Sequence, residues 1–340
     1  MIEYRDPITG YMIRKYTEGP ERNSKLYFTS ENFSVDDKYF YFNKNQTHGC
    51  NDGGCYRVDV ATGEMTQVTD ETYTGFALDR VKNVAYVSKN DYEVYMVNLD
   101  DNSLTKVGEL PKGGKLTTHF TAANTGRIAC SYHLPSKIYS LIVLDPGKEC
   151  EIVYQSDYRL GHAQICPTDE NLIFYIHETE GDAFQRTWMF DVPERYVRPY
   201  YVEHPNEWIT HETWTADGSH MVFMWIPGKI ILGDKDGRHF DPVYEYEGRI
   251  LHPGVSRDMQ WMCTDRCWKD ENGTAHFGPV LVNPRTGKDL LLAAPFDCLT
   301  GRDHVHPSFN RKGDQILFAA PDENGIAQMC LIDLTQLTRP

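Results

Sequence analysis

Leu172-Ile173-Phe174-Tyr175-Ile176 is one of seven short apolar runs that recur along the chain at similar intervals. The runs begin near residues 39, 84, 128, 172, 221, 261 and 316, so the offsets are 45, 44, 44, 49, 40 and 55 residues. Each run is followed by a loop and a further strand, as in VYMVNLDDNS (94–103), and no long segment shows the apolar spacing of a helix. The repeat predicts an all-β fold: a seven-bladed β-propeller with four-stranded antiparallel blades around a central channel.

The two ends of the chain complement each other in this repeat. The last unit stops before its outer strand, whereas residues 11–19 (YMIRKYTEG) resemble the outer-strand segment of other units. We expect residues 11–19 to complete the last blade, so that an N-terminal strand closes the ring and removes an exposed edge. Residues 1–340 would then form a single β-propeller domain. A solenoid or a sandwich is the alternative, although a sandwich would not repeat so regularly.

Composition restricts the possible partners. The net charge of −15 argues against nucleic acid and against an anionic membrane surface. The N-terminus lacks the features of a signal peptide, and no run of about 18 apolar residues is present. The nine cysteines lack regular spacing; free thiols are favoured over zinc pairs at Cys263/Cys267 or Cys50/Cys55. A cytoplasmic protein is expected, and the sequence does not indicate an oligomeric state.

Five histidines share one position in the repeat. Each lies ten residues before an equivalent residue of the apolar run: His119, His162, His211, His252 and His306. Equivalent positions in a propeller form a ring in space. Because this position leads into the strand expected to be innermost, the ring should face the central channel. The alternative is that the imidazoles only pack against one another across a narrow channel.

The stretch Asp303-His304-Val305-His306-Pro307-Ser308-Phe309 contains two histidines two residues apart. On an extended strand both side chains would point the same way. Together with His252 from the preceding blade, they could bind one divalent metal ion, and three protein ligands with open positions are typical of a catalytic site. His211 would lie nearby without binding the metal, and the cation would keep it neutral as a general base.

We expect Arg186 to lie on a second strand of the fourth unit. If it faces the channel, its guanidinium could bind a carboxylate in bidentate fashion. The alternative is a solvated surface arginine. A G-x-S-x-G elbow, a P-loop and a dinucleotide-binding glycine motif are absent from the sequence.

Several motifs resemble those of the oligogalacturonate lyases, polysaccharide lyase family twenty-two. They occur in the family's order over residues 155–335: Leu160-Gly161-His162, Ile176-His177-Glu178, Arg186-Thr187-Trp188, Thr210-His211-Glu212-x-Trp214-x-x-Asp217-Gly218, Leu251-His252 and His304-x-His306-Pro307-Ser308-Phe309. The first three blades match only in their general propeller character.

This resemblance implies a seven-bladed propeller that uses manganese to cleave short, acidic pectic oligosaccharides by β-elimination. It implies that His252, His304 and His306 bind Mn²⁺ or another divalent metal, that His211 is the catalytic base and that Arg186 assists at the substrate. Further candidates for substrate binding are His119, His162 and His177. One position departs from the family: Gly301 stands where a metal-binding Gln is expected. Alternative functions are a lyase for another uronate linkage and a non-catalytic propeller that binds a ligand or a partner.

Overall fold

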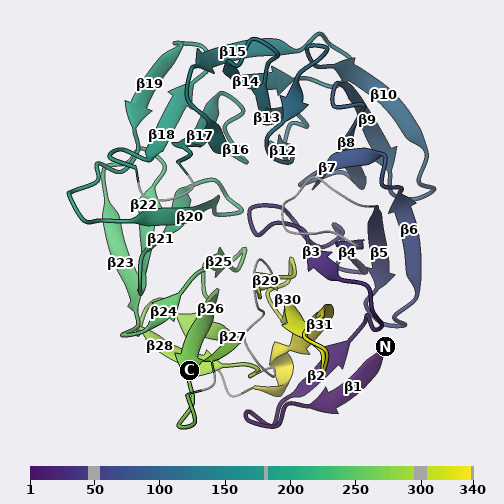
Figure 1. The fold of residues 1–340 in the computed structure, drawn as a ribbon, viewed down its shortest axis with the longest axis vertical. Coiled ribbons are helices and arrows are strands. Elements are labelled where there is room, and N and C mark those ends of the chain that lie inside the picture. The colour runs from purple at the N-terminus through teal and green to yellow at the C-terminus, as the bar shows by residue number, and fades with distance from the viewer. Residues whose placement is uncertain (45–53, 180–182, 274, 295–304, 338–340) are drawn as a thin grey trace.

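The computed structural model describes residues 1–44, 54–179, 183–273, 275–294 and 305–337. Seven small antiparallel sheets form a ring, which confirms the predicted all-β, seven-bladed propeller (Figure 1). The regular helical structure in the described residues is a single 3₁₀ turn, η1 (Leu334–Gln336). No helix in this part of the chain is long and apolar enough to span a membrane.

Four blades have the predicted four strands in simple order. Blade one consists of β3 (Asn23–Lys25), β4 (Tyr39–Lys44), β5 (Cys55–Asp59) and β6 (Met65–Thr69). Blade two consists of β7 (Tyr73–Leu78), β8 (Val84–Lys89), β9 (Glu93–Asn98) and β10 (Leu104–Glu109). Blade four consists of β16 (Leu160–Ile165), β17 (Leu172–His177), β18 (Thr187–Asp191) and β19 (Tyr196–Pro199). Blade five consists of β20 (Ile209–Trp214), β21 (His220–Trp225), β22 (Lys229–Asp234) and β23 (Phe240–Glu245).

In blades three and six the innermost strand is split into two short pieces that pair with the same neighbour. Blade three consists of β11 (Lys115–Leu116), β12 (Thr121–Ala122), β13 (Ile128–His133), β14 (Tyr139–Leu144) and β15 (Glu151–Ser156). Blade six consists of β24 (Arg249–Ile250), β25 (Gly254–Val255), β26 (Met262–Lys269), β27 (Ala275–Asn283) and β28 (Lys288–Leu291).

Blade seven joins the two ends of the chain. It consists of β29 (Ser308–Phe309), β30 (Gln315–Pro321), β31 (Ala327–Asp333), β2 (Met12–Lys15) and β1 (Ile2–Arg5). Ile13 of β2 pairs with Ile332 of β31, so an N-terminal strand closes the ring as predicted. β1 then adds a fifth, outermost strand to this blade, which the repeat did not predict (Figure 1).

The repeated apolar runs form the second strand of each blade, not the innermost one. In blade four, for example, β17 lies between β16 and β18, and its residues Leu172 to Ile176 are all buried. A strand in this position is covered on both faces by the neighbouring blades, so it is continuously apolar. The innermost strand is the more polar segment before it, and it is this segment that bears the repeated histidines.

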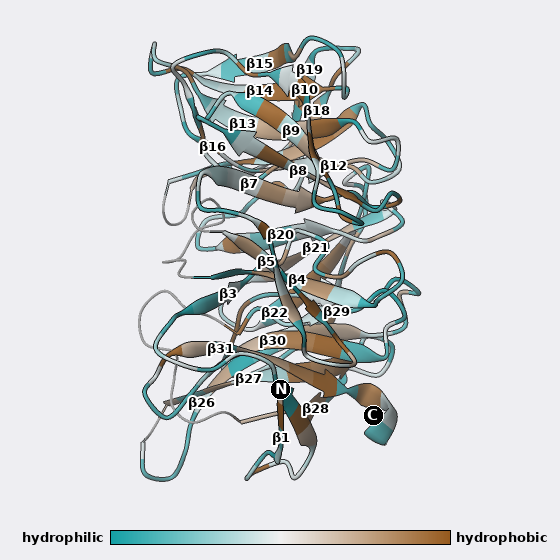
Figure 2. Cartoon of the chain, turned by 90° about the vertical axis from the view of Figure 1, so that its right-hand side faces the viewer, coloured by the Kyte–Doolittle hydropathy of each residue, from teal (hydrophilic) through white to brown (hydrophobic). Residues whose placement is uncertain are grey.

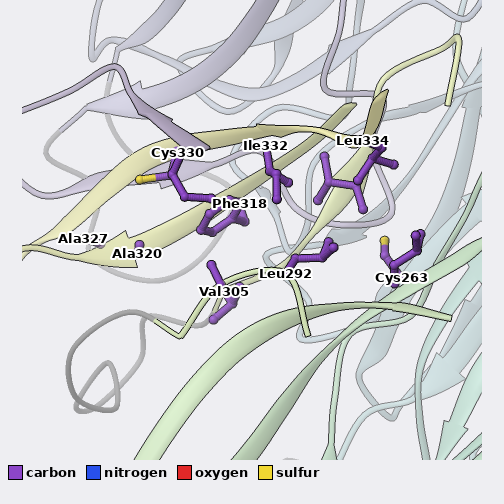
Figure 3. Packing of buried hydrophobic residues seen from close by; sticks show 13 residues of the cluster. Cys263, Leu292, Val305, Phe318, Ala320, Ala327, Cys330, Ile332 and Leu334 are labelled. Carbon is purple, nitrogen blue, oxygen red and sulfur yellow. The ribbon is translucent and has the colours of Figure 1, made fainter. Parts of the chain in front are cut away.

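The hydrophobic core is divided among the seven interfaces between adjacent blades. One buried cluster lies between blades six and seven and includes Cys263, Leu292, Phe318 and Ile332 (Figure 3). Six further clusters among the described residues occupy the other interfaces. In the side view of Figure 2, apolar stretches run along the strands. Each fully buried Leu or Phe contributes about 1.5–3 kcal/mol to the free energy of folding. Because these residues lie between blades, every blade is stabilised by packing against both of its neighbours.

Candidate functional site

Tyr27 and Phe28 follow β3 of blade one and lie at the centre of the histidine ring. The Tyr27 ring centroid is 5.8 Å from His119, 5.8 Å from His162 and 5.7 Å from His306. The Phe28 ring centroid is 5.7 Å from His211 and 5.4 Å from His252. The five histidines predicted from the repeat are therefore gathered around two adjacent aromatic residues.

Three of these imidazoles form a cluster in which His252 contacts both of the others. The ring centroids of His211 and His252 are 4.3 Å apart, and those of His252 and His306 are 3.8 Å apart. His252 is buried, whereas His211 and His306 are partly exposed. This group lies where blades five, six and seven meet the channel, and we refer to it as the triple-histidine cluster.

The innermost strands are irregular at the histidine position. In β16 and β20 the pairing register shifts around His162 and His211, which have φ angles of +45° and +56°. A β-bulge re-aims a side chain, and non-glycine residues in this backbone region cost roughly 1–3 kcal/mol unless their surroundings hold them. In blade two the equivalent bulge contains Gly75, whose φ is +69°. The backbone geometry thus recurs even where the histidine does not.

His306 does not lie on an extended strand, so that part of the prediction was wrong. It precedes β29, and its φ is +44°. The side chains of a His-x-His pair point the same way only on regular extended backbone. His304 and Gly301 lie outside the described residues.

A buried carboxylate holds His252. The Nδ1 atom of His252 lies 2.8 Å from Asp265 Oδ2, and the backbone N–H of His252 donates to Asp265 Oδ1 at 2.7 Å. Both side chains are buried. Because Nδ1 is used by Asp265, a metal ion would have to bind His252 through Nε2. Carboxylates commonly hold metal-binding histidines in this way.

A second buried carboxylate, Glu212, lies next to His211 in the sequence and connects Arg186 with His162. Its Oε2 lies 2.8 Å from His162 Nδ1, and its Oε1 accepts from Arg186 Nε at 3.4 Å. Arg186 also donates to Glu178 Oε1 at 3.5 Å and is only 4% exposed. The alternative of a solvated surface arginine is therefore wrong.

Electrostatics keep Glu212 ionised. Burial alone would raise its pKa, but the charge of Arg186 and the hydrogen bond with His162 outweigh burial and lower the pKa to about 2. His119 is affected in a different way. Burial, followed by repulsion from His162, lowers its pKa to about 4, so its ring is neutral near pH 7. The Nε2 atom of His119 lies 3.0 Å from Thr29 Oγ1.

His177 lies in the same blade as His162, at the end of β17. It pairs with Leu160 in the sheet, and its ring contacts that of Tyr158 in a tilted arrangement with centroids 4.3 Å apart. Its backbone N–H donates to the carbonyl oxygen of Arg186 at 2.8 Å. This hydrogen bond joins the backbone of His177 to that of Arg186.

Repeat analysis missed Tyr27, Phe28 and Asp265. Tyr27 and Phe28 come from blade one, which has no histidine at the repeat position. This missing histidine was a signal that other side chains fill the channel there. Asp265 directly follows the apolar run of blade six. A charged residue at that point is unusual, because such residues are rarely buried without a partner.

The described residues alone do not complete a metal site. They contain no group of three or more His, Cys, Asp or Glu side chains arranged to hold a metal ion. His252 and His306 provide two adjacent imidazoles with a carboxylate behind one of them. These two residues suit a divalent metal, and a third protein ligand would have to come from elsewhere, such as His304.

Comparison with known proteins gives the same family that the sequence motifs resemble. No protein-family model matches the chain. The oligogalacturonate lyase of Dickeya dadantii (strain 3937) is 25% identical over 372 residues, which covers 93% of this chain and 92% of that enzyme. Over almost its whole length, the chain is similar to an oligogalacturonate lyase. The oligogalacturonide lyase of Pectobacterium atrosepticum is 27% identical over 194 residues, about half of each protein.

The fold agrees with this relationship. A solved structure of oligogalacturonate lyase in complex with manganese superposes with a TM-score of 0.84 at 20% identity, covering 98% of this chain and 96% of that one. The match includes blades one to three, where the sequence motifs were weakest. The likeness of fold therefore extends over the whole propeller.

Proposed function

We propose that this protein is a metal-dependent lyase that cleaves short uronate oligosaccharides, such as oligogalacturonates, by β-elimination. The observation that supports the proposal is the triple-histidine cluster: the proposed base His211 contacts the proposed metal ligand His252, which also contacts His306. The similarity to the Dickeya enzyme over 93% of the chain supports the same reaction class.

The candidate metal ligands are His252, His306 and His304. A divalent cation such as Mn²⁺ would neutralise the uronate carboxylate and stabilise the negative charge that develops on it during the reaction. Asp265 would orient the His252 ring for this role. With Gly301 in place of a family ligand, water or Asp303 would have to complete the coordination.

His211 would act as the base. It would take the C5 proton, which lies α to the carboxylate, onto a ring nitrogen. The electrons of the C5–H bond would form the C4–C5 double bond, and those of the C4–O bond would leave with the glycosidic oxygen, which would take up a proton from water. The products are an unsaturated uronate and a shortened sugar. The bulge at His211 would help to hold its backbone, and so to position the ring before the substrate binds.

Arg186 would assist at the substrate carboxylate, and Glu212 would hold it in place. Because Glu212 accepts from Arg186 and also pairs with His162, one buried carboxylate orients two of the proposed substrate-binding residues. His119 and His177 complete the proposed substrate contacts. The acidic oligosaccharide is the proposed partner, and the cytoplasmic location stays a prediction.

The test is an assay of purified protein with digalacturonate and other uronate disaccharides, with Mn²⁺ and after chelation. We expect ultraviolet absorbance from the new double bond that depends on the metal. The panel also tests the alternative of another uronate linkage. A protein that purifies without metal and cleaves no uronate would overturn the proposal. Ligand binding that survived in that case would favour the non-catalytic alternative.

A further inference from the structure

Three arginines occupy one equivalent position in three blades. Arg80, Arg257 and Arg311 are each the second residue of the turn that follows the innermost strand, in blades two, six and seven. Each lies five residues after the histidine position of its blade, which is occupied by Gly75, His252 and His306. The repeat thus produces a second set of equivalent positions at the other end of the innermost strands.

These arginines follow the innermost strands, whereas His252 and His306 precede them. Five residues of chain span at most about 17 Å when fully extended, and less here because the backbone at His306 is not extended. We refer to the arginine end of these strands as the opposite mouth of the channel. The loop after β3 connects the two ends, because Phe28 contacts the histidines and also lines the cavity beside Glu31.

The arginines converge on Glu31 of blade one. Its Oε1 accepts from Arg80 Nη1 at 2.9 Å and from Arg257 Nη2 at 2.8 Å. The Nη2 atom of Arg311 is 3.9 Å from the other oxygen, Oε2. Burial opposes the ionisation of Glu31, but the three arginines outweigh it and lower its pKa to about 2. One carboxylate therefore faces three guanidinium groups, which leaves an excess of two positive charges among the ionisable side chains that line the cavity.

Neighbouring carboxylates do not remove this excess from the cavity. Asp37 accepts the backbone N–H groups of Arg311 and Lys312, and Asp79 accepts those of Val81 and Lys82. Neither aspartate lines the cavity. The charge is notable because the whole chain has a net charge of −15.

Arg257 is the guanidinium that is best placed to bind a further anion. Its side chain is 35% exposed, compared with 12% for Arg80 and 9% for Arg311. The guanidinium of Arg311 is held in place by a hydrogen bond, because its Nη1 donates to the carbonyl oxygen of Arg80 at 2.6 Å. The cluster thus combines two rigid arginines with one that is accessible.

The cavity limits the size of the ligand. Its volume is about 80 Å³, whereas sites for drug-sized molecules measure about 300–1,000 Å³. It has room for a few water molecules or one small ion, and not for an oligosaccharide. Guanidinium groups favour phosphate and carboxylate, which they bind through two parallel hydrogen bonds.

The geometry points to a second ligand site at this mouth of the channel, in which Arg257, Arg80 and Arg311 bind a compact, multiply charged oxyanion of the phosphate or small-dicarboxylate class. This site is separate from the histidine ring and does not depend on the proposed lyase reaction. Glu31 holds the arginines together when the site is empty and competes with the incoming anion.

The test is calorimetric titration of the full-length, metal-loaded protein with inorganic phosphate and, separately, with malonate, in a chloride background. We expect one anion per chain to bind, and the tighter ligand identifies the class. Arg257→Gln should weaken binding at least about tenfold, because it removes charged hydrogen bonds. Glu31→Gln should strengthen binding, since it removes the competing charge. Arg238→Gln, an exposed arginine of blade five, is the matched control and should bind like the wild type.

Two results would overturn the assignment. The first is that neither anion binds to the wild type. The second is that Arg257→Gln binds the anion as tightly as the wild type does. Either result would mean that the arginines form only a structural ion cluster. Because Arg257 is partly exposed, its substitution should leave the fold intact, and a thermal melt of each variant checks this. Weaker binding by folded Glu31→Gln would also contradict the proposed competition.

Discussion

The Nδ1 atom of His252 lies 2.8 Å from Asp265 Oδ2, and both side chains are buried at the inner end of blade six. This pair joins a residue that repeat analysis identified to one that it missed. It also leads to the most direct test of the proposed metal site.

Asp265→Asn should weaken metal binding by about 10–100-fold, because the amide no longer fixes the His252 ring or supports its basicity. Metal content after dialysis against limiting Mn²⁺, together with titration of Mn²⁺, measures this. Asp289→Asn is the control: Asp289 is in the same blade but pairs with Tyr244 and Arg266. Equal metal affinity in both variants would show that Asp265 has only a structural role.

His211→Gln should lower kcat by about 10²–10⁴-fold, the usual contribution of a general base. Metal content should be unchanged, because His211 is not a proposed ligand. The assay measures kcat and KM on the best uronate substrate. His133→Gln, which removes a stacking contact with Tyr139 in blade three, should keep wild-type activity. Activity of the His211 variant within a few-fold of wild type would exclude it as the base.

Glu212→Gln should destabilise the protein by about 3–5 kcal/mol, because Arg186 would lose a buried countercharge. Urea denaturation followed by tryptophan fluorescence measures the free energy of unfolding. Glu247→Gln removes an exposed carboxylate and should change that free energy by less than about 0.5 kcal/mol. A comparable, small change in both variants would mean that the Glu212 ion pairs contribute little.

His119 should make the stability depend on pH. Its pKa is about 4 in the folded protein and 6.5 in the unfolded chain. Between these values only the unfolded chain binds the proton, so the free energy of unfolding falls as the pH falls from 6.5 to 4. The loss from this group should be about 3 kcal/mol at most. Denaturation of chelated wild type and His119→Gln at several pH values tests this. Parallel pH profiles for the two proteins would contradict the expectation.

The roles of the histidines depended on two kinds of information. Spacing alone grouped His119, His162, His211, His252 and His306, because a repeat of about 45 residues converts equal register into a ring. Spacing could not show that His306 is on left-handed backbone or that Arg186 is buried between Glu178 and Glu212. Such details depend on bulges and on contacts between blades.

The amino-acid sequence by itself determined the seven blades, the closure of the ring by an N-terminal strand and the histidine register. These features follow from local patterns: apolar strands at regular intervals and polar turns between them. Tertiary structure alone decided which strand is innermost, the insertion of Tyr27 and Phe28 among the histidines, and the grouping of Arg80, Arg257 and Arg311 around Glu31. The reason is physical: these contacts join residues more than forty positions apart, and only the packing of one blade against another brings them together.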